Sequence, residues 1–220
     1  DPTSTRQIVL NTSSDILSEK DVRIALQHAT NKQNISDGIF YGLEKPADTL
    51  FASTVPYCDI ELEPYAYDLE LAGQILDDAG WKMGSGNIRE KDGQQLNIDL
   101  LYNSDSVTEK SIAEYLQSEY QSIGVSLNIH GEEEQSYRDN MKAGNFDMVF
   151  NICWGTPYDP QSSLAAMRAP VYGDYAAQLG LDDKAEIDDA ITEILITTDE
   201  DRRQELYTSV LTHLHEDAVY

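Results

Sequence analysis

The chain has 220 residues, the length of one large domain or two small ones, and no apolar run approaches the ~20 residues of a membrane-spanning helix. Its 40 acidic residues against 15 basic residues give a net charge of −25. This balance excludes a nucleic-acid partner, because phosphate contacts need clustered lysine and arginine. The two cysteines, Cys58 and Cys153, stand in no paired motif. We therefore expect both to be small buried apolar residues.

The first half of the sequence predicts two helices, one strand and a long loop. The segment Gln7–Asn11 predicts a strand, and Ser18 is expected to cap the helix that follows it. Residues 42–64 contain three prolines and no periodicity, which indicates a long ordered loop of the kind that often has a function. A helix over residues 67–79 and a glycine-containing turn over residues 84–93 come next.

The second half predicts a regular alternation of strands and helices. Strands are predicted at Leu96–Tyr102, Val125–Ile129 and Phe146–Cys153, with helices beginning at Ser106 and Glu133 between them and two further helices over residues 185–196 and 201–216. Three strands joined by two helices of this length form a βαβαβ unit, whose strands are parallel and whose connections are right-handed. The fold class is therefore α/β, with one main sheet flanked by helices.

Both ends of the sequence lead us to expect a piece of a longer protein. The sequence does not begin with methionine, and Ala218-Val219-Tyr220 has the pattern of an apolar strand that has just begun. Natural chain ends are more often polar and frayed.

Signatures of catalysis are missing from the sequence, which holds no G-x-S-x-G, no S-x-x-K and no glycine-rich phosphate loop. The histidines form no H-E-x-x-H pair, and we expect surface or partly packed side chains at His28, His130, His213 and His215. The acidic run 132–134 fits a helix start, where carboxylates favour the positive end of the helix dipole. Two alternatives stay open beside a binding module: a hydrolase that uses acids near Glu132, and an acidic interaction domain.

The most informative segment is W-G-T-P-Y-D-P, residues 154–160, which directly follows the last apolar strand. Ligands of open α/β sheets bind beyond the carboxyl ends of the strands. Trp154 and Tyr158 stand there, and their amphipathic rings suit stacking and a single hydrogen bond. The pattern leaves a second interpretation open, in which Trp154 is a core residue and Tyr158 lies on the surface.

Nearly the whole chain resembles the large C-terminal lobe of extracytoplasmic solute-binding proteins that serve dipeptide, oligopeptide and nickel ABC importers. The motifs that carry this resemblance are Asp21-Val22-Arg23-Ile24-Ala25-Leu26, Asn31-Lys32, Tyr41-Gly42, Ala47-Asp48-Thr49-Leu50-Phe51-Ala52, Val55-Pro56-Tyr57, Ala79-Gly80-Trp81, Ile88-Arg89-Glu90-Lys91-Asp92-Gly93, the segment 154–160 and residues 214–220. The nickel-binding branch is the most similar, because it shares Gly131-Glu132-Glu133-Glu134, the segment 154–160 and Met167-Arg168-Ala169-Pro170.

The resemblance implies a lobe of the type II periplasmic-binding-protein fold. Residues 1–220 would then form a single C-terminal lobe of a two-lobed protein, with the other lobe absent. The implied protein is a monomer and a binding protein, not an enzyme, with no cofactor and no catalytic residue. It would capture nickel or another metal chelate, or a peptide, and deliver this small-molecule solute to an ABC permease in the membrane. The implied location is extracytoplasmic, either periplasmic or lipid-anchored on the outer face of the cell membrane.

The resemblance also implies ligand-binding residues, position by position. Trp154 and Tyr158 match the tryptophan and tyrosine that line the cleft of the nickel-binding relatives. Tyr172 stands where those relatives have a metal-ligating histidine, and Arg138, with Tyr137 beside it, stands at the place of another cleft tyrosine. A phenol is a poor donor to Ni²⁺, so no metal ligand is predicted in this chain. Any metal is expected to arrive already bound by a chelator.

Overall fold

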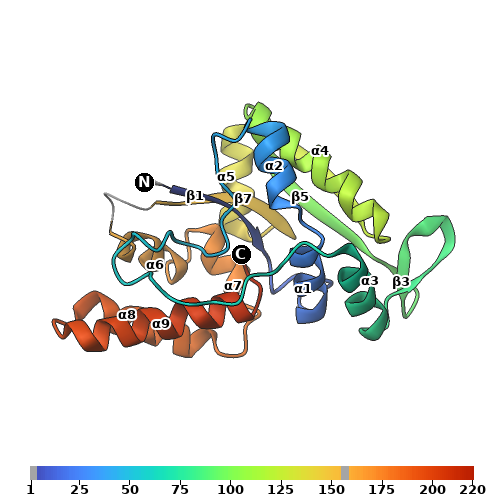
Figure 1. Cartoon of the computed structure of the whole chain (residues 1–220). Helices are drawn as coiled ribbons and strands as arrows, with labels where there is room; N and C mark the ends of the chain where they lie inside the picture. The colour runs from blue at the N-terminus through green and yellow to red at the C-terminus, as the bar shows by residue number, and fades with distance from the viewer. Residues whose placement is uncertain (1–3, 155–158) are drawn as a thin grey trace.

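A four-stranded sheet forms the centre of the molecule (Figure 1), in the order β1-β7-β5-β6. The structure is a computed structural model that describes residues 4–154 and 159–220. The strands are β1 (Ser4–Leu10), β5 (Asn97–Asn103), β6 (Ser126–Glu132) and β7 (Met148–Trp154). Strands β6 and β7 both pair with β5 in parallel, and β1 runs antiparallel to β7.

The predicted βαβαβ unit is confirmed. Helix α4 (Val107–Ser122) connects β5 to β6, and α5 (Glu134–Ala143) connects β6 to β7. The Oγ of Ser106 accepts a hydrogen bond from the backbone N–H of Glu109, which fixes the start of α4. Gly144 has a φ of 73°, the left-handed conformation that ends many helices, and it follows the last turn of α5.

The two faces of the sheet are covered by different helices. One face packs against α1 (Lys20–His28), α3 (Leu69–Asp78) and α4, and their apolar residues form the first core cluster with Ile98, Leu100 and Phe150. Helix α2 (Lys32–Ile39) packs beside α4. The other side of the molecule carries α5, α6 (Gln161–Met167), α7 (Gly173–Gln178), α8 (Lys184–Ile196) and α9 (Glu200–Glu216). No helix in the described part of the chain is both long and apolar enough to cross a membrane.

Some predicted details are wrong. Ser18 does not cap α1, because its hydroxyl donates to the carbonyl of Asp15 while Glu19 occupies the cap position. The predicted turn over residues 84–93 is part of a small antiparallel sheet with a short 3₁₀ helix. This small sheet contains β2 (Lys82–Met83), η1 (Ser85–Asn87), β3 (Arg89–Lys91) and β4 (Gln94–Gln95).

The long loop that precedes α3 crosses the molecule as an extended strap (Figure 1). Phe51, Val55 and Cys58 from this strap are buried in the second core cluster, which also contains Cys153 and residues of α6, α8 and α9. Both cysteines are free and buried, as predicted. Burial raises the pKa of the Cys58 thiol to about 12 and also raises that of Cys153, so both remain protonated at neutral pH.

Candidate functional site

The carboxyl ends of the three parallel strands lie at the same edge of the sheet, which we call the carboxyl edge. Strand β5 ends at Asn103, β6 at Glu132 and β7 at Trp154, and Asn103 is directly opposite Glu132 in the pairing of β5 with β6. Helices α4 and α5 begin just beyond β5 and β6, so their positive N-terminal ends lie at this edge. In an open α/β sheet, this edge is where ligands bind.

Trp154 lies at the end of a strand whose burial changes along its length. On one face of β7, Met148 and Phe150 are buried, whereas Ile152 and Trp154 are 39% and 50% exposed. Ile152 is opposite Arg6 of β1, whose guanidinium lies 5.4 Å from the centre of the Phe40 ring and 3.2 Å from a carboxylate oxygen of Glu44. The half-exposed Trp154 fits the interpretation of an edge aromatic better than that of a core residue. Tyr158 lies outside the described residues.

Tyr172 occupies the position just before α7 and is 52% exposed. The two residues that follow it are buried: Gly173 packs against Met141 of α5, and the Asp174 carboxylate accepts hydrogen bonds from Asn151 and Tyr220. The turn that carries Tyr172 is therefore attached to both α5 and β7. Its hydroxyphenyl ring faces solvent beside an equally exposed Val171.

Tyr137 and Arg138 are neighbours in α5 but have different environments. The Tyr137 side chain is buried, and its hydroxyl donates to the carbonyl of Phe150 in β7 at 2.7 Å. This burial raises the pKa of Tyr137 well above its usual value. Arg138 is exposed and pairs with Glu134, one helical turn earlier. Arg138 thus offers a cation near the carboxyl edge, while Tyr137 anchors α5 to the sheet. A ligand contact by either residue stays a prediction.

The acidic residues near the carboxyl edge are engaged in local structure. One carboxylate oxygen of Glu132 accepts hydrogen bonds from the side chains of Ser136 and Asn140, both in α5. Glu109 accepts from the backbone N–H of Asn103 at 2.9 Å, and partial burial raises the pKa of its carboxyl group. Within residues 4–154 and 159–220, no group of three His, Cys, Asp or Glu side chains could hold a metal ion.

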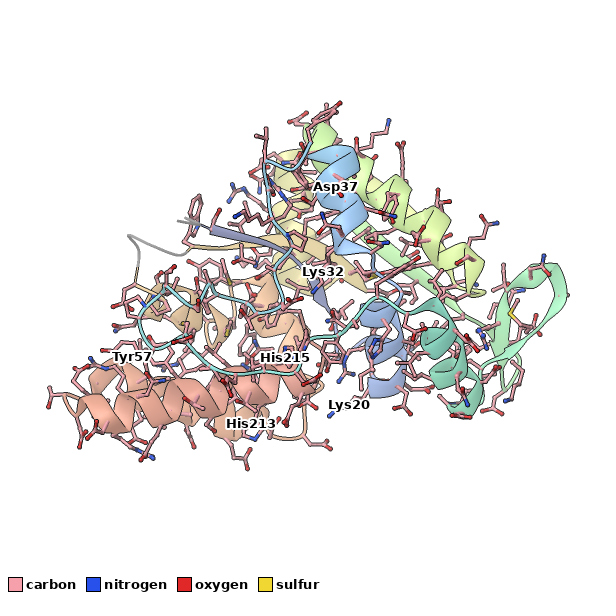
Figure 2. All side chains as sticks on the ribbon, viewed as in Figure 1. Lys20, Lys32, Asp37, Tyr57, His213 and His215 are labelled. Atoms are coloured by element: carbon pink, nitrogen blue, oxygen red, sulfur yellow. The ribbon has the colours of Figure 1, made fainter. Side chains whose placement is uncertain are left out.

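The four histidines make contacts within the protein, as expected for partly packed side chains. His28 and His215 donate to the carbonyls of Ala66 and Glu63 at 2.7 Å, and both rings contact the ring of Tyr65. Figure 2 shows His213 and His215 on different sides of α9. His213 donates to the carbonyl of Ser209, one turn earlier in α9, and an Nε2 to Oδ1 distance of 3.2 Å joins His130 to Asp99.

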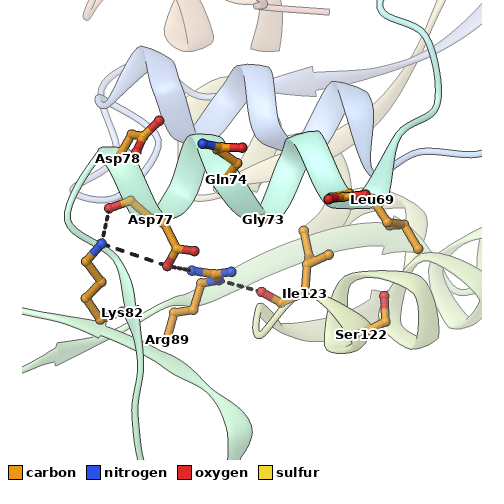
Figure 3. A pocket seen from close by; sticks show the side chains of 10 residues that line it. Leu69, Gly73, Gln74, Asp77, Asp78, Lys82, Arg89, Ser122 and Ile123 are labelled. Atoms are coloured by element: carbon orange, nitrogen blue, oxygen red, sulfur yellow. Dashed lines mark hydrogen bonds and ion pairs between the residues drawn. The ribbon is translucent and has the colours of Figure 1, made fainter.

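A hollow away from the carboxyl edge lies between α3 and β3 (Figure 3). The buried side chain of Arg89 forms one wall and makes three hydrogen bonds. Its Nε donates to the carbonyl of Ile123 at 2.6 Å, and its Nη1 donates to the Asp77 carboxylate at 2.8 Å and to the Trp81 carbonyl at 2.7 Å. Arg89 therefore joins α3, the small sheet and the end of α4, and we assign the hollow a structural role.

The sequence did not point to Arg6 or Asp174 as residues near the site. Arg6 contacts Phe40 and Glu44, which lie more than thirty residues later in the chain, so no local sequence pattern predicts these contacts. Asp174 is one of 40 acidic residues in the sequence, and only the fold shows that it is 94% buried, since its exposed fraction is 6%. Neither position has a local signal that separates it from an ordinary surface charge.

Comparison with known proteins connects this architecture to a family. Residues 1–174 match the model of bacterial extracellular solute-binding proteins, family 5, middle region. The chain belongs to this family. Over 220 residues, it is 44% identical to the nickel-binding periplasmic protein of Escherichia coli strain K12, covering 100% of the chain and 42% of that relative. The dipeptide-binding protein of the same organism is 24% identical over 208 residues, 94% of the chain and 38% of that relative.

Solved structures agree with the family assignment. NikA from Brucella suis, in complex with Fe(III)-EDTA, is 47% identical and superposes with a TM-score of 0.97, covering 100% of this chain and 44% of that one. This likeness confirms the predicted type II periplasmic-binding-protein fold. The chain spans less than half the length of the relatives named here. The family description, extracellular solute-binding proteins, agrees with the expectations of a binding protein and of an extracytoplasmic location.

Proposed function

We propose that residues 1–220 form one lobe of the solute-binding component of an ABC importer. The full protein captures a metal chelate, nickel chelates foremost, between this lobe and a second one, and delivers it as a monomer to the permease in the membrane. A peptide is the alternative solute. Capture proceeds by closure of the two lobes around the solute, as in other two-lobed binding proteins.

One observation carries the proposal: a family 5 lobe whose carboxyl edge presents the half-exposed Trp154 at the end of β7. Aromatic rings with one exposed face suit a flat or hydrophobic ligand surface. The solute class follows from the relatives, because NikA of Brucella suis holds Fe(III)-EDTA and the Escherichia coli relative is a nickel-binding protein. Tyr158 and Tyr172 are proposed to complete the aromatic lining, and Arg138 to contribute charge at its rim.

The chemistry of the donors favours a chelate over a free metal ion. Ni²⁺ binds well to imidazole, but the resemblance places Tyr172 where the nickel-binding relatives have a histidine, and a phenol is a poor donor. Among the described residues, no three metal-binding side chains converge. A metal that reaches this lobe therefore needs most of its ligands from a small molecule, and the protein supplies apolar contact and hydrogen bonds to that molecule.

Calorimetry on the full-length protein tests the proposal with four probes: Ni²⁺ with two equivalents of L-histidine, Fe(III)-EDTA, Ni²⁺ alone and a tripeptide. We expect tight binding of at least one chelate and weak or no specific binding of Ni²⁺ alone. Binding of the tripeptide but of neither chelate would make this a peptide importer. Binding of none of the four would contradict the proposed solute classes.

The isolated lobe provides a second test. It has its own buried core on both faces of the sheet, so we expect residues 1–220 to fold cooperatively without the rest of the protein. It should bind the same chelates far more weakly, because the second lobe supplies half of the contacts. Sub-micromolar binding by the isolated lobe would mean that the site lies elsewhere on this chain.

A further inference from the structure

A buried hydrogen-bond network lies directly behind the turn that carries Tyr172. At its centre is Asp174, in the first turn of α7, with an exposed fraction of only 6%. One carboxylate oxygen accepts from Nδ2 of Asn151 in β7 at 2.6 Å, and the other accepts from the hydroxyl of Tyr220 at 3.0 Å. A single side chain thus joins α7 to the central sheet and to the last residue of the chain.

The hydrogen-bond network continues from Tyr220 through Gln178 to Lys184 in α8. The hydroxyl of Tyr220 accepts from Nε2 of Gln178 at 2.7 Å, and Oε1 of Gln178 accepts from Nζ of Lys184 at 3.0 Å. Burial raises the pKa of Asp174, while its hydrogen bonds and the nearby Lys184 charge oppose that shift. Removing one partner from such a network leaves the others unsatisfied in a poorly solvated interior.

The contacts of Asp174 connect the segments that carry Trp154 and Tyr172. Asn151 lies three residues before Trp154 in β7, and Tyr172 lies two residues before Asp174. Gly173, which lies between Tyr172 and Asp174, packs closely against α5, since a Cβ added at Gly173 would lie only 3.3 Å from Cε of Met141. The position of the Tyr172 turn relative to the carboxyl end of β7 therefore depends on the pairing of Asp174 with Asn151.

We propose that Asp174 is a positioning residue for ligand binding, which holds the Tyr172 turn at a fixed place beside the Trp154 end of β7; this inference rests on the proposed function. Asp174 itself is buried behind the turn and is not proposed to touch the solute. Its effect on affinity comes from preorganisation, because a turn that is already placed has less freedom to lose when the solute binds.

A swap of donor and acceptor provides the sharpest test. Asp174→Asn places an amide opposite the Asn151 amide, whose Oδ1 already accepts from the backbone N–H of Ile152. The new amide has one acceptor oxygen where the carboxylate has two, so it cannot accept from both Nδ2 of Asn151 and the hydroxyl of Tyr220. The double variant Asp174→Asn/Asn151→Asp restores one donor and one acceptor and leaves an oxygen for the Tyr220 hydroxyl. The full-length protein is titrated with Ni²⁺ plus L-histidine and with Fe(III)-EDTA. We expect the single variant to lose about tenfold in affinity, as for displaced anchors, and the double variant to recover most of it.

Asp147 offers a matched control at the other end of β7. Its carboxylate is also partly buried, accepts from the backbone N–H of Asp99 at 2.8 Å and has a raised pKa, but it lies just before the strand begins. Asp147→Asn should change thermal stability to a similar extent and leave the affinity unchanged. An equal loss of affinity in Asp147→Asn, or no recovery in the double variant, would overturn the inference.

Hydrogen exchange separates this inference from the proposed function. The backbone N–H groups of Val171 and Tyr172 both donate to the carbonyl of Ala169 and report on the turn without any ligand. Their exchange should be faster in Asp174→Asn and slow again in the double variant. If the parent protein binds neither probe, the proposed function fails, and the exchange measurement still decides the role of Asp174. Unchanged exchange in Asp174→Asn would overturn the positioning role directly.

Discussion

The two tryptophans of this chain lie in regions with opposite properties. Trp81 follows α3 and is 2% exposed in the first core cluster, where its Nε1 donates to a carboxylate oxygen of Glu19 at 3.3 Å and the Lys91 ammonium lies 5.7 Å from its ring centre. Trp154 ends β7 and is half exposed. The same residue type thus stabilises the fold in one region and presents an aromatic face to solvent in the other.

The difference shows where the chain leaves apolar surface in water. Each Å² of apolar surface kept in water forgoes about 25 cal/mol of hydrophobic stabilisation. The Trp81 side chain forgoes almost none, whereas Ile152, Trp154, Val171 and Tyr172 are all between 39% and 52% exposed near one edge of the sheet. Several exposed apolar residues near one edge are typical of a surface that another molecule covers. Substitutions in the two regions should therefore change different quantities.

The largest effect is expected from Trp81→Ala in the isolated lobe. Emptying a site that is 98% buried, since the exposed fraction is 2%, removes the transfer free energy of the indole and leaves a cavity. The expected loss is about 3–5 kcal/mol of unfolding free energy. Urea denaturation of the lobe measures it. A loss below about 1 kcal/mol, typical of a surface site, would contradict the assignment of Trp81 to the core.

Trp154→Ala should act on affinity in the full-length protein. We expect chelate binding to weaken by about 2 kcal/mol, the range of an aromatic anchor, because the ring is proposed to contact the solute. The unfolding free energy should fall by less than the loss at Trp81. Calorimetry and thermal melts on the same sample separate the two quantities. A large stability loss with unchanged affinity would instead support the alternative interpretation, in which Trp154 is a core residue.

Much of the fold follows from sequence patterns, because long amphipathic helices and buried strands have clear periodicity. Helices α4, α8 and α9, and the parallel strands β5 to β7, lie where the apolar spacing predicts them. Short helices such as α6 and α7 were missed. Seven or six residues give too few turns for a periodic signal. The small sheet around β3 was missed because strands of two or three residues have no alternation to detect.

The candidate site was less accessible from sequence. Trp154 could be named because it follows a buried strand in a motif with two prolines. Exposure, however, is a tertiary property: Tyr137 and Arg138 are adjacent in the chain, yet one is buried under β7 and the other is exposed. The supporting network of Asp174 joins β7 and α7 to Tyr220, three segments that are distant in sequence, so no local pattern predicts it.

Tyr172→His adds a metal donor to the exposed surface near Trp154 and leaves the core around Trp81 unchanged. An imidazole at this position should raise the affinity of the full-length protein for Ni²⁺ without chelator by about tenfold, or about 1.4 kcal/mol, provided that the turn lies at the cleft. Chelator-free titration measures the gain, with Tyr172→Phe as a control that alters the hydroxyl only. Tight chelator-free binding by the parent protein, with nitrogen ligands in X-ray absorption, would overturn the argument that metal arrives as a chelate.

The smallest effect is expected at Glu109, a partly buried acid at the carboxyl edge. Burial raises the pKa of its carboxyl group, Glu134 adds to the shift, and Arg6 and the hydrogen bond from the Asn103 N–H oppose it. The folded state therefore holds this proton more tightly than the unfolded chain. The stabilisation from that proton is fully present below the ordinary glutamate pKa of about 4.3 and is lost as the pH rises through the raised value.

Glu109→Gln keeps an oxygen that can accept from Asn103 but removes the titration. At pH 7 the Glu109 carboxylate of the parent is ionised and partly desolvated, which lowers the stability of the folded state. The variant should therefore be more stable, by at most about 0.5 kcal/mol. At pH 3.5, where the parent carboxyl is largely protonated, the advantage should vanish. Urea denaturation of the isolated parent chain and the isolated variant chain at the two pH values measures the difference. A variant that is less stable at pH 7, or a stability difference that does not depend on pH, would contradict this prediction. It would mean that the Asn103 hydrogen bond and the Arg6 charge stabilise the Glu109 carboxylate by more than burial destabilises it.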